Sequence, residues 1–224
     1  KANNGDLDII AKTFDIPELK LYSGGRVNRW EDKANFAPMF EFESLNTPDV
    51  SGTSSVNKSE IIDITSKMTP DGKLSWDVPA GKWTIMRIGY SLTGAKNSPA
   101  VPAGTGLEVD KFSRKHLESY YFNYTKIIKD AIGPMYGKVL RYWLVDSYEA
   151  DAQNWTDDMI NEFITRRGYD PIPFLPVLTG RIVENSEVSD RFLWDFRRTI
   201  ADLLADEHYG YITELAHRDG IKTY

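Results

Sequence analysis

The 224-residue chain contains no cysteine. A disulfide framework, a thiolate metal site and a thiol nucleophile are therefore excluded for this sequence, although the absence does not decide the compartment. No apolar run approaches the ~20 residues of a membrane span. The formal net charge of -6 argues against nucleic acid as the main partner. Phosphate-binding loops and dinucleotide-binding fingerprints are absent as well, which argues against nucleotide chemistry.

The composition that remains is that of a globular protein, with 41% hydrophobic and 27% charged residues. The length fits one or two domains. Aromatic residues make up 12% of the chain, with six Trp and twelve Tyr. Core packing explains most such rings, and stacking on the faces of sugar rings is the functional alternative.

The first 105 residues have the two-residue hydrophobic period of β-strands and many turn signals. A hairpin is predicted where Leu74, Trp76 and Val78 alternate with polar residues between two turns. We expect residues 1–105 to be a β-rich accessory or inserted region with an antiparallel, β-sandwich-like sheet. Its predicted strands lie at residues 12–16, 19–22, 39–43 and 60–65 and in the hairpin 73–92.

Residues 106–224 alternate between strand and helix patterns. The apolar residues adopt a helical period after Ser113, and that stripe ends at Gly133. Further helices are predicted between Thr156 and Gly168 and from Ser189 to Gly220, and a new strand starts at residue 221. This order predicts an α/β fold in which crossover helices connect parallel strands.

The stretch 138–155, KVLRYWLVDSYEADAQNW, organises this region. Its apolar run predicts a strand buried on both faces, and the run stops at Asp146. The carboxyl ends of parallel strands form the ligand-binding edge of open α/β sheets and of (β/α)₈ barrels. Glu149 is therefore the strongest catalytic candidate. Its neighbours Asp146 and Tyr148 are candidates for binding a substrate.

Two further carboxylates, Glu108 and Asp110, lie on one face of a short predicted strand at residues 106–110. Parallel strands release their side chains at the same edge, so these groups could converge with Asp146 and Glu149. Glycoside hydrolysis requires two carboxyl groups. Acidic residues at strand ends also cap helices or bind loop amides, and this structural role stays open.

Other constellations carry less information. Hard oxygen ligands for Ca²⁺ are close in sequence, but they lack the glycine of an EF-hand loop, so the metal ligands stay unassigned. Three histidines fall on predicted helices and match no catalytic or zinc-binding pattern. The candidate oxygen ligands are Asp146, Glu149, Asp151, Asn154 and Asp157, and the histidines are His116, His208 and His217.

Several motifs in order resemble glycoside hydrolase family 106, the α-L-rhamnosidases. They are GLEVDKFS at residues 106–113, DSYEA at 146–150, NWT at 154–156 and SDRFLWDFRRTIADLL at 189–204. WDVPAGKWTIMRIGYSLTG at residues 76–94 also looks like that family. The resemblance is dense from residue 76 onward, and the combination of motifs is more specific than any one of them.

The resemblance implies a large enzyme with a (β/α)₈ barrel decorated by β-domains. Such an enzyme hydrolyses terminal α-L-rhamnosides of plant or bacterial polysaccharides with inversion and holds the sugar with a bound Ca²⁺. Glu149 would match one of two catalytic glutamates. Residues 106–224 would be part of the barrel, and the second glutamate and the missing strands would lie outside this chain. The candidate substrate-binding residues are Asp146, Tyr148, Asp110, Glu108, Asn154 and Trp155.

The expected partners are an oligo- or polysaccharide substrate and the remainder of the same polypeptide, with no nucleic acid and no membrane span. We expect the enzyme to work in the periplasm or outside the cell, and the 224-residue chain alone to release no rhamnose. The alternative is a non-catalytic carbohydrate-binding or structural module. Exposure of Trp76 or Trp83 on a sheet face would favour that alternative.

Overall fold

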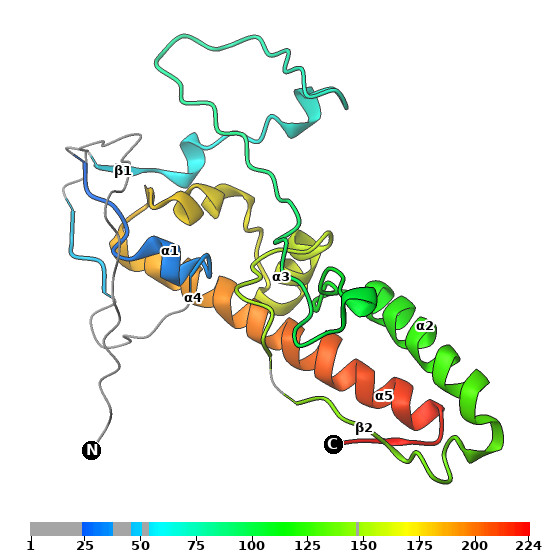
Figure 1. Ribbon diagram of the computed structural model, residues 1–224. Helices are drawn as coiled ribbons and strands as arrows, with labels where there is room; N and C mark the ends of the chain where they lie inside the picture. The colour runs from blue at the N-terminus through cyan, green and yellow to red at the C-terminus, as the bar shows by residue number, and fades with distance from the viewer. Residues whose placement is uncertain (1–23, 38–45, 51–53, 147) are drawn as a thin grey trace, which may run out of the picture.

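The computed structural model describes residues 24–37, 46–50, 54–146 and 148–224. A long helical rod runs through the molecule, and shorter helices pack along it (Figure 1). The predicted strands at residues 12–16, 19–22 and 39–43 lie outside the described ranges.

The rod consists of α4 (Ser186–Leu203), a π-helical turn (Leu204–Gly210) and α5 (Tyr211–Arg218). The side chain of Asn185 caps α4 by accepting a hydrogen bond from the backbone N–H of Val188 at 2.8 Å. The prediction of one long helix that ends at Gly220 is confirmed in outline. Its start lies three residues earlier than predicted.

Two helices pack beside the rod, α2 (Arg114–Ile132) along α5 and α3 (Met159–Arg167) along α4 (Figure 1). Both have the predicted boundaries to within two residues. Gly168 ends α3 in the left-handed conformation, with φ of 81°, which glycine adopts without steric cost.

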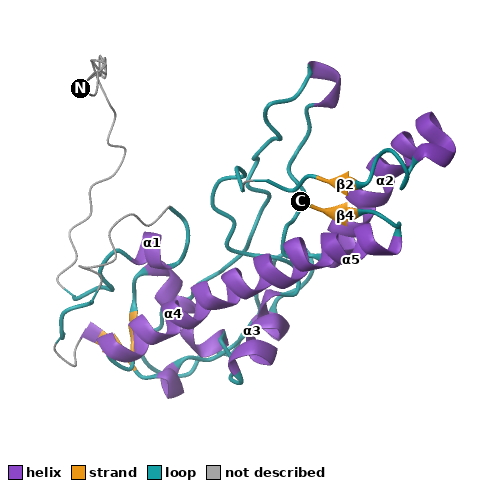
Figure 2. Ribbon diagram, turned by 90° about the horizontal axis from the view of Figure 1, so that it is seen from below, coloured by secondary structure: helices purple, strands orange, loops and turns teal. Residues whose placement is uncertain are grey.

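The strand predicted at the start of the acidic stretch is β2 (Tyr142–Trp143), and it pairs in parallel with β4 (Lys222–Thr223) (Figure 2). The pairing continues through the N–H of Val145, which donates to the carbonyl of Tyr224 at 2.9 Å. Helices cross over between the two strands, so the predicted parallel α/β arrangement is present, and the strand expected from residue 221 is confirmed.

The predicted burial of that strand on both faces is wrong for the described residues. Trp143 and Val145 pack against the cores of α2 and α5. Tyr142 and Leu144, on the opposite face, are 53% and 64% exposed. One layer of helices covers one face, and no described element covers the other.

A second pair of parallel strands, β1 (Ser55–Val56) with β3 (Ile182–Val183), was not predicted. It lies near α1 (Trp30–Lys33) and the N-terminal end of α4 (Figure 1). The described chain also contains 3₁₀ helices at Lys58–Glu60, Thr65–Lys67, Pro102–Gly104, Gly133–Met135 and Ile172–Thr179.

The apolar side chains form two clusters along the rod. The first cluster lies between α3, α4 and β3, and the second lies between α2, α5 and β2. A π turn holds more residues than an α-helical turn, so it rotates the apolar stripe of the rod from one cluster to the other. The largest buried side chains of the first cluster are Met159, Phe163, Ile182, Phe192, Leu193, Phe196 and Leu203, and those of the second are Leu117, Tyr121 and Leu215.

Residues 61–107 correct three predictions. The strand at 60–65 is absent, the strand at 106–110 is reduced to a single bridge between Lys96 and Leu107, and the hairpin at 73–92 is open apart from a bridge between Met68 and Leu74. Most of this segment is exposed, and much of its trace extends away from the rod (Figure 1). A two-stranded hairpin is only marginally stable without a packed face, and no described element packs on this one. A β-sandwich is therefore not seen in the described residues.

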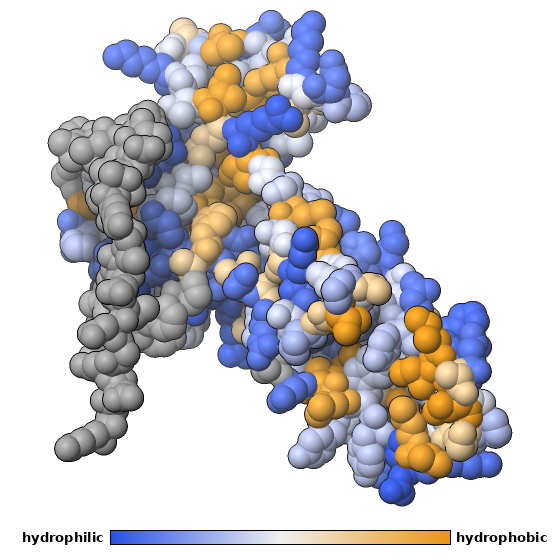
Figure 3. All heavy atoms as spheres, viewed as in Figure 1, coloured by the Kyte–Doolittle hydropathy of each residue, from blue (hydrophilic) through white to orange (hydrophobic). Residues whose placement is uncertain are grey.

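The surface carries an apolar patch over the far end of α2 and the turn that leads to β2 (Figure 3). No helix within the described ranges is long and apolar enough to cross a membrane. The exposed large apolar residues of this end of the molecule include Ile127, Met135 and Val139.

Candidate active site

A cavity of about 530 Å³ lies where the acidic stretch meets α4. This volume is within the range of small-molecule sites. One wall is polar and comes from the loop after β2, and the opposite wall comes from α4. The lining residues are Asn35, Phe112, Tyr148, Glu149, Asp151, Ala152, Gln153, Arg197, Ile200, Ala201 and Leu204.

The loop after β2 brings Glu149 and Tyr148 into this lining, as the position of the strand end predicts. Glu149 is exposed and Tyr148 is half-buried. Asp151 follows in the left-handed conformation, with φ of 57°. A non-glycine residue in that region stores backbone strain, and such strain is often found at functional sites.

Asp110 lies behind the cavity, with its carboxylate engaged by its own chain. It accepts hydrogen bonds from the backbone N–H of Phe112 at 2.9 Å, from Gln153 Nε2 at 2.5 Å and from Thr156 Oγ1 at 2.7 Å. His116 Nδ1 lies 3.6 Å from the same carboxylate. Asp110 therefore holds the cavity loop to the start of α2, which is the structural role left open above.

A second set of hydrogen bonds fixes the loop to the turn after α1. Asn35 donates through Nδ2 to the carbonyl of Gln153 at 2.9 Å, and Asn154 donates through Nδ2 to the carbonyl of Ala34 at 3.0 Å. Asn35 is itself left-handed, with φ of 58°, a conformation that asparagine tolerates better than most residues. These two hydrogen bonds join segments that are more than a hundred residues apart in the sequence.

Glu108 forms an ion pair with Lys111, with 2.8 Å between Oε2 and Nζ. The ammonium of Lys111 also lies 5.9 Å from the centre of the Tyr148 ring. Burial raises the pKa of the Tyr148 hydroxyl, and the nearby Glu108, Asp151 and Tyr209 raise this pKa further. Tyr148 therefore keeps its proton at neutral pH and can donate a hydrogen bond.

The α4 wall contributes Arg197 beside Ile200 and Leu204. Burial lowers the pKa of the Arg197 guanidinium, and the carboxylate of Asp32 opposes this effect. Arg198 pairs with Asp202 at 2.9 Å, whereas Arg197 lines the cavity.

The other predicted residues occupy different places. Asp146 is exposed at the end of β2. Trp155 packs against the first core cluster, with its ring 6.3 Å from Phe196 and 6.1 Å from Tyr90. Asn35, Gln153 and Arg197 were missed as site residues. Only Arg197 had a local signal, since its helical spacing places it between Leu193 and Ile200.

This arrangement suits the binding of a polar ligand with apolar faces. A carboxylate and a protonated phenol lie on one side, and aliphatic side chains and a guanidinium lie on the other. Within the described residues, no group of three or more His, Asp or Glu side chains lies close enough together to hold a metal ion.

Comparison with known proteins identifies the family of this chain. The model of glycoside hydrolase family 106, described as alpha-L-rhamnosidase, matches residues 3–224. The solved structure of a rhamnosidase from Novosphingobium sp. PP1Y is similar with a TM-score of 0.79 and 41% identity, over 92% of this chain and 20% of that one. A curated protein of Formosa agariphila, named "Putative beta-glucuronidase", is 44% identical over 167 residues. That match covers 75% of this chain and 14% of the relative.

Proposed function

The chain belongs to glycoside hydrolase family 106, and from this membership we propose that it forms part of the catalytic region of a larger α-L-rhamnosidase. The enzyme would hydrolyse terminal α-L-rhamnosides of plant or bacterial oligo- and polysaccharides. The observation that carries the proposal is the position of Glu149, at the carboxyl end of a parallel strand and on the wall of a cavity of about 530 Å³.

In this proposal Glu149 is one of two catalytic carboxyl groups. Inversion needs a general acid and a general base ~6.5–9.5 Å apart, so that a water molecule fits between the base and the sugar. Tyr148, which keeps its proton, would donate a hydrogen bond to a sugar hydroxyl. The partner carboxyl group would come from outside this chain, and the chain alone would therefore be inactive.

The architecture proposed for the complete enzyme is a (β/α)₈ barrel. The parallel pair β2 and β4 with its helical crossover supports this, since it is the repeating unit of such barrels. The open face of β2, with Tyr142 and Leu144 exposed, would then point into the barrel and pack against further strands of the same polypeptide.

The test is Glu149→Gln in the complete enzyme, with Glu187→Gln as the matched control because Glu187 is an exposed glutamate on α4. With an aryl α-L-rhamnoside, we expect kcat of Glu149→Gln to fall by roughly 10²–10⁴-fold and that of Glu187→Gln to stay unchanged. Proton NMR of the first product formed reports inversion. Near-normal turnover of Glu149→Gln would remove it from the mechanism.

The name of the Formosa relative makes an aryl β-glucuronide the second substrate for the same assay. Glucuronide hydrolysis without rhamnoside hydrolysis would replace the proposed substrate class and leave the assignment of Glu149 to be tested on the new substrate.

A second candidate function, carbohydrate binding by residues 1–105, is favoured by one observation. Trp83 is 39% exposed and stacks edge to face on Trp76, with 5.4 Å between the ring centroids. A sugar could pack on the open side of this pair. In the complete protein, Trp83→Ala would then weaken polysaccharide binding but spare hydrolysis of a small aryl rhamnoside. Unchanged binding would assign the rings to packing.

The proposal also includes a bound Ca²⁺ ion and the cellular compartment in which the enzyme works. The enzyme would hold a Ca²⁺ ion with ligands that include residues outside the described ranges or outside this chain. It would work in the periplasm or outside the cell, where polysaccharide substrates are found.

A further inference from the structure

A second cavity, of about 630 Å³, is also bounded by α4. Its volume, too, is within the range of small-molecule sites. The α4 residues of this cavity and those of the active-site cavity each have the spacing of one helical face. Val188 and Arg197, the first residues of the two sets, are about two and a half turns apart, so the cavities lie on opposite faces of α4, about 14 Å apart along its axis. The first set is Val188, Arg191, Phe192 and Asp195, and the second is Arg197, Ile200 and Ala201.

Three residues that line the second cavity are aromatic. Phe174 stacks on Phe192 with 5.4 Å between the ring centroids, and it lies edge to face with Tyr169 at 5.8 Å. Phe192 is buried in the first core cluster, whereas Tyr169 and Phe174 are half-buried. These two rings therefore keep part of their apolar surface for a ligand that presents an apolar face, as a sugar ring does.

Two carboxylates line the same cavity. Asp195 accepts a hydrogen bond from the hydroxyl of Tyr169 through Oδ2 at 2.9 Å. Asp170 accepts one from the backbone N–H of Ile172 through Oδ1, also at 2.9 Å. These bonds fix the direction of both carboxylates. Within the described ranges the second oxygen of each has no hydrogen bond, so both carboxylates can accept one from a ligand.

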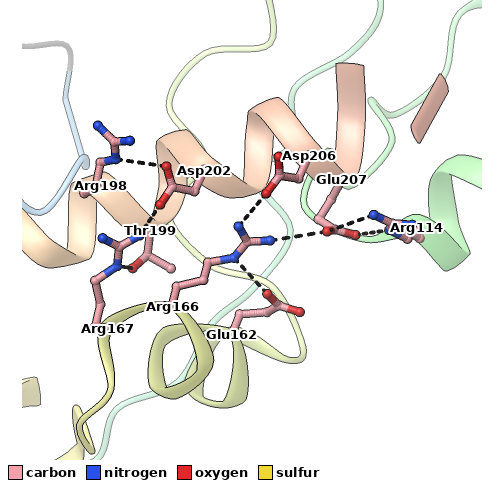
Figure 4. A network of polar contacts seen from close by, with 9 residues as sticks. All are labelled: Arg114, Glu162, Arg166, Arg167, Arg198, Thr199, Asp202, Asp206 and Glu207. Carbon is pink, nitrogen blue, oxygen red and sulfur yellow. Dashed lines mark hydrogen bonds and ion pairs between the residues drawn. The ribbon is translucent and has the colours of Figure 1, made fainter. Parts of the chain in front are cut away.

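The arginines near Asp195 bind another carboxylate. Figure 4 shows that Arg167 of α3 and Arg198 of α4 both bind Asp202. In the part of the chain that the structure describes, Asp195 forms no ion pair, although it is half-buried. A carboxylate that loses water without gaining a cation costs free energy. Hydroxyl groups of a ligand would supply the missing hydrogen bonds.

The charges of the second cavity favour a neutral ligand. The carboxylates of Asp170 and Asp195 would repel an acidic sugar. The cations that line the cavity, Lys58 and Arg191, are exposed and therefore screened by salt. Arg191 also lies 3.6 Å from the carboxylate of Glu187, which offsets its charge.

We propose that the second cavity is a separate carbohydrate-binding site, which holds a neutral sugar residue of the polysaccharide substrate. The apolar face of the sugar would pack on Tyr169 and Phe174, and two of its hydroxyls would donate hydrogen bonds to Asp170 and Asp195. A glycan chain held at this site and at the active-site cavity would bind more tightly than at either alone. The inference goes beyond the proposed function and draws on it only for the carbohydrate nature of the substrate.

The test is affinity electrophoresis of the complete enzyme through gels that contain a polysaccharide with neutral α-L-rhamnosyl side chains. Asp195→Asn and Asp170→Asn keep the shape of each side chain and remove its charge. Asp130→Asn is the matched control, because it removes the same charge from an exposed aspartate on α2. Relative to gels without polysaccharide, we expect Kd to rise about 5-fold in each cavity variant, further in the double variant, and not in the control.

Kinetics with two substrates separate this site from the active-site cavity. For a small aryl α-L-rhamnoside, Asp195→Asn should keep wild-type kcat and KM, since that substrate occupies only the active-site cavity. For the polysaccharide, KM should rise by about the same factor as Kd. Asp170 is exposed, so Asp170→Asn gives the same comparison should Asp195→Asn not fold.

The outcomes distinguish this site from the proposed function. An enzyme that is inactive on rhamnosides but is retarded less as Asp195→Asn than as Asp130→Asn would lose the proposed function and keep the second site. Absence of retardation of the wild type would overturn the second site. Equal retardation of the wild type, the cavity variants and the control would also overturn it, and the rhamnosidase assignment would stand on its own assay.

Discussion

The two acidic segments of the candidate site, residues 108–112 and 146–153, differ in what surrounds their carboxylates. Asp110 is enclosed by three donors of its own chain, and Glu108 is paired with Lys111. Glu149 is exposed on the wall of a cavity. Acidic side chains at two predicted strand ends thus have different surroundings, because Phe112, Gln153 and Thr156 donate hydrogen bonds to the carboxylate of Asp110, whereas Glu149 lines the cavity.

This difference teaches how to separate a supporting carboxylate from a reacting one. A carboxylate whose lone pairs are used by its own backbone and side chains contributes to folding, and its loss should be measured as stability. A carboxylate on a cavity wall contributes to chemistry, and its loss should be measured as rate.

The largest effect on stability is expected from Asp110→Ala. Three hydrogen bonds to a charged acceptor are lost, and the free energy of unfolding should fall by about 4 kcal/mol. Urea unfolding of the complete enzyme measures this change. Glu149→Gln is the matched variant and should stay within about 0.5 kcal/mol of the wild type. Equal losses of unfolding free energy in Asp110→Ala and Glu149→Gln would contradict the distinction between a supporting and a reacting carboxylate.

Acidification should lower the free energy of unfolding of the protein through the protonation of His208. The pKa of His208 is about 4 in the folded protein against its ordinary 6.5, so the unfolded chain binds more protons between these pH values. Stability is therefore retained above pH 6.5 and lost as the pH falls toward 4, by about 3 kcal/mol from this residue.

Unfolding free energies measured from pH 7 to pH 4 report this effect, and His208→Asn should flatten the curve. A wild-type curve with the same slope as that of His208→Asn would show that burial does not hold the imidazole neutral.

Substitutions of Asn35 test how much its hydrogen bond to Gln153 stabilises the cavity wall. Asn35→Ala removes the hydrogen bond to Gln153 and places alanine at φ of 58°, so we expect a loss of roughly 2 kcal/mol. Asn35→Gly removes the same hydrogen bond but tolerates the backbone, and should cost about 1 kcal/mol. The difference between the variants isolates the backbone strain. Identical values would show that the turn relaxes.

The smallest effect is expected at Trp83, in the exposed segment outside both acidic regions. Trp83→Ala loses a partly exposed ring contact with Trp76, and the free energy of unfolding should change by about 0.5 kcal/mol. Thermal unfolding of the complete enzyme and of Trp83→Ala measures this small change in stability. A loss as large as that of Asp110→Ala would mean that these rings pack into a core in the complete protein.

The features predicted best are those whose signals are local. Caps, glycine stops and the 3.6-residue period lie within one segment, and they predict α2, α3 and the rod with small boundary errors. Strands that depend on their neighbours were predicted wrongly. The alternation at residues 73–92 is a real β pattern, but the described chain gives it no surface to pack on. The two-residue strands β1 and β3 carry no pattern long enough to detect.

The candidate site divides in the same way. Glu149 and Tyr148 were predicted because an apolar run ends just before them, and the start of a strand at residue 221 was predicted from its composition. Asn35 and Gln153 were missed because their contact spans 118 residues. The π-helical turn at residues 204–210 was missed because no local sequence pattern marks it, and the arginines that bind its acidic residues, Arg114 and Arg166, come from two other helices.

The sequence by itself therefore determined α2, α3 and the rod, the positions of the strands β2 and β4 in a parallel α/β fold, and the acidic end of β2. These features follow from periodicity and from local hydrogen-bonding needs. Only the tertiary structure decided which carboxylate is enclosed and which one faces the cavity. That choice depends on donors from distant segments, and a one-dimensional pattern does not encode which of them will meet.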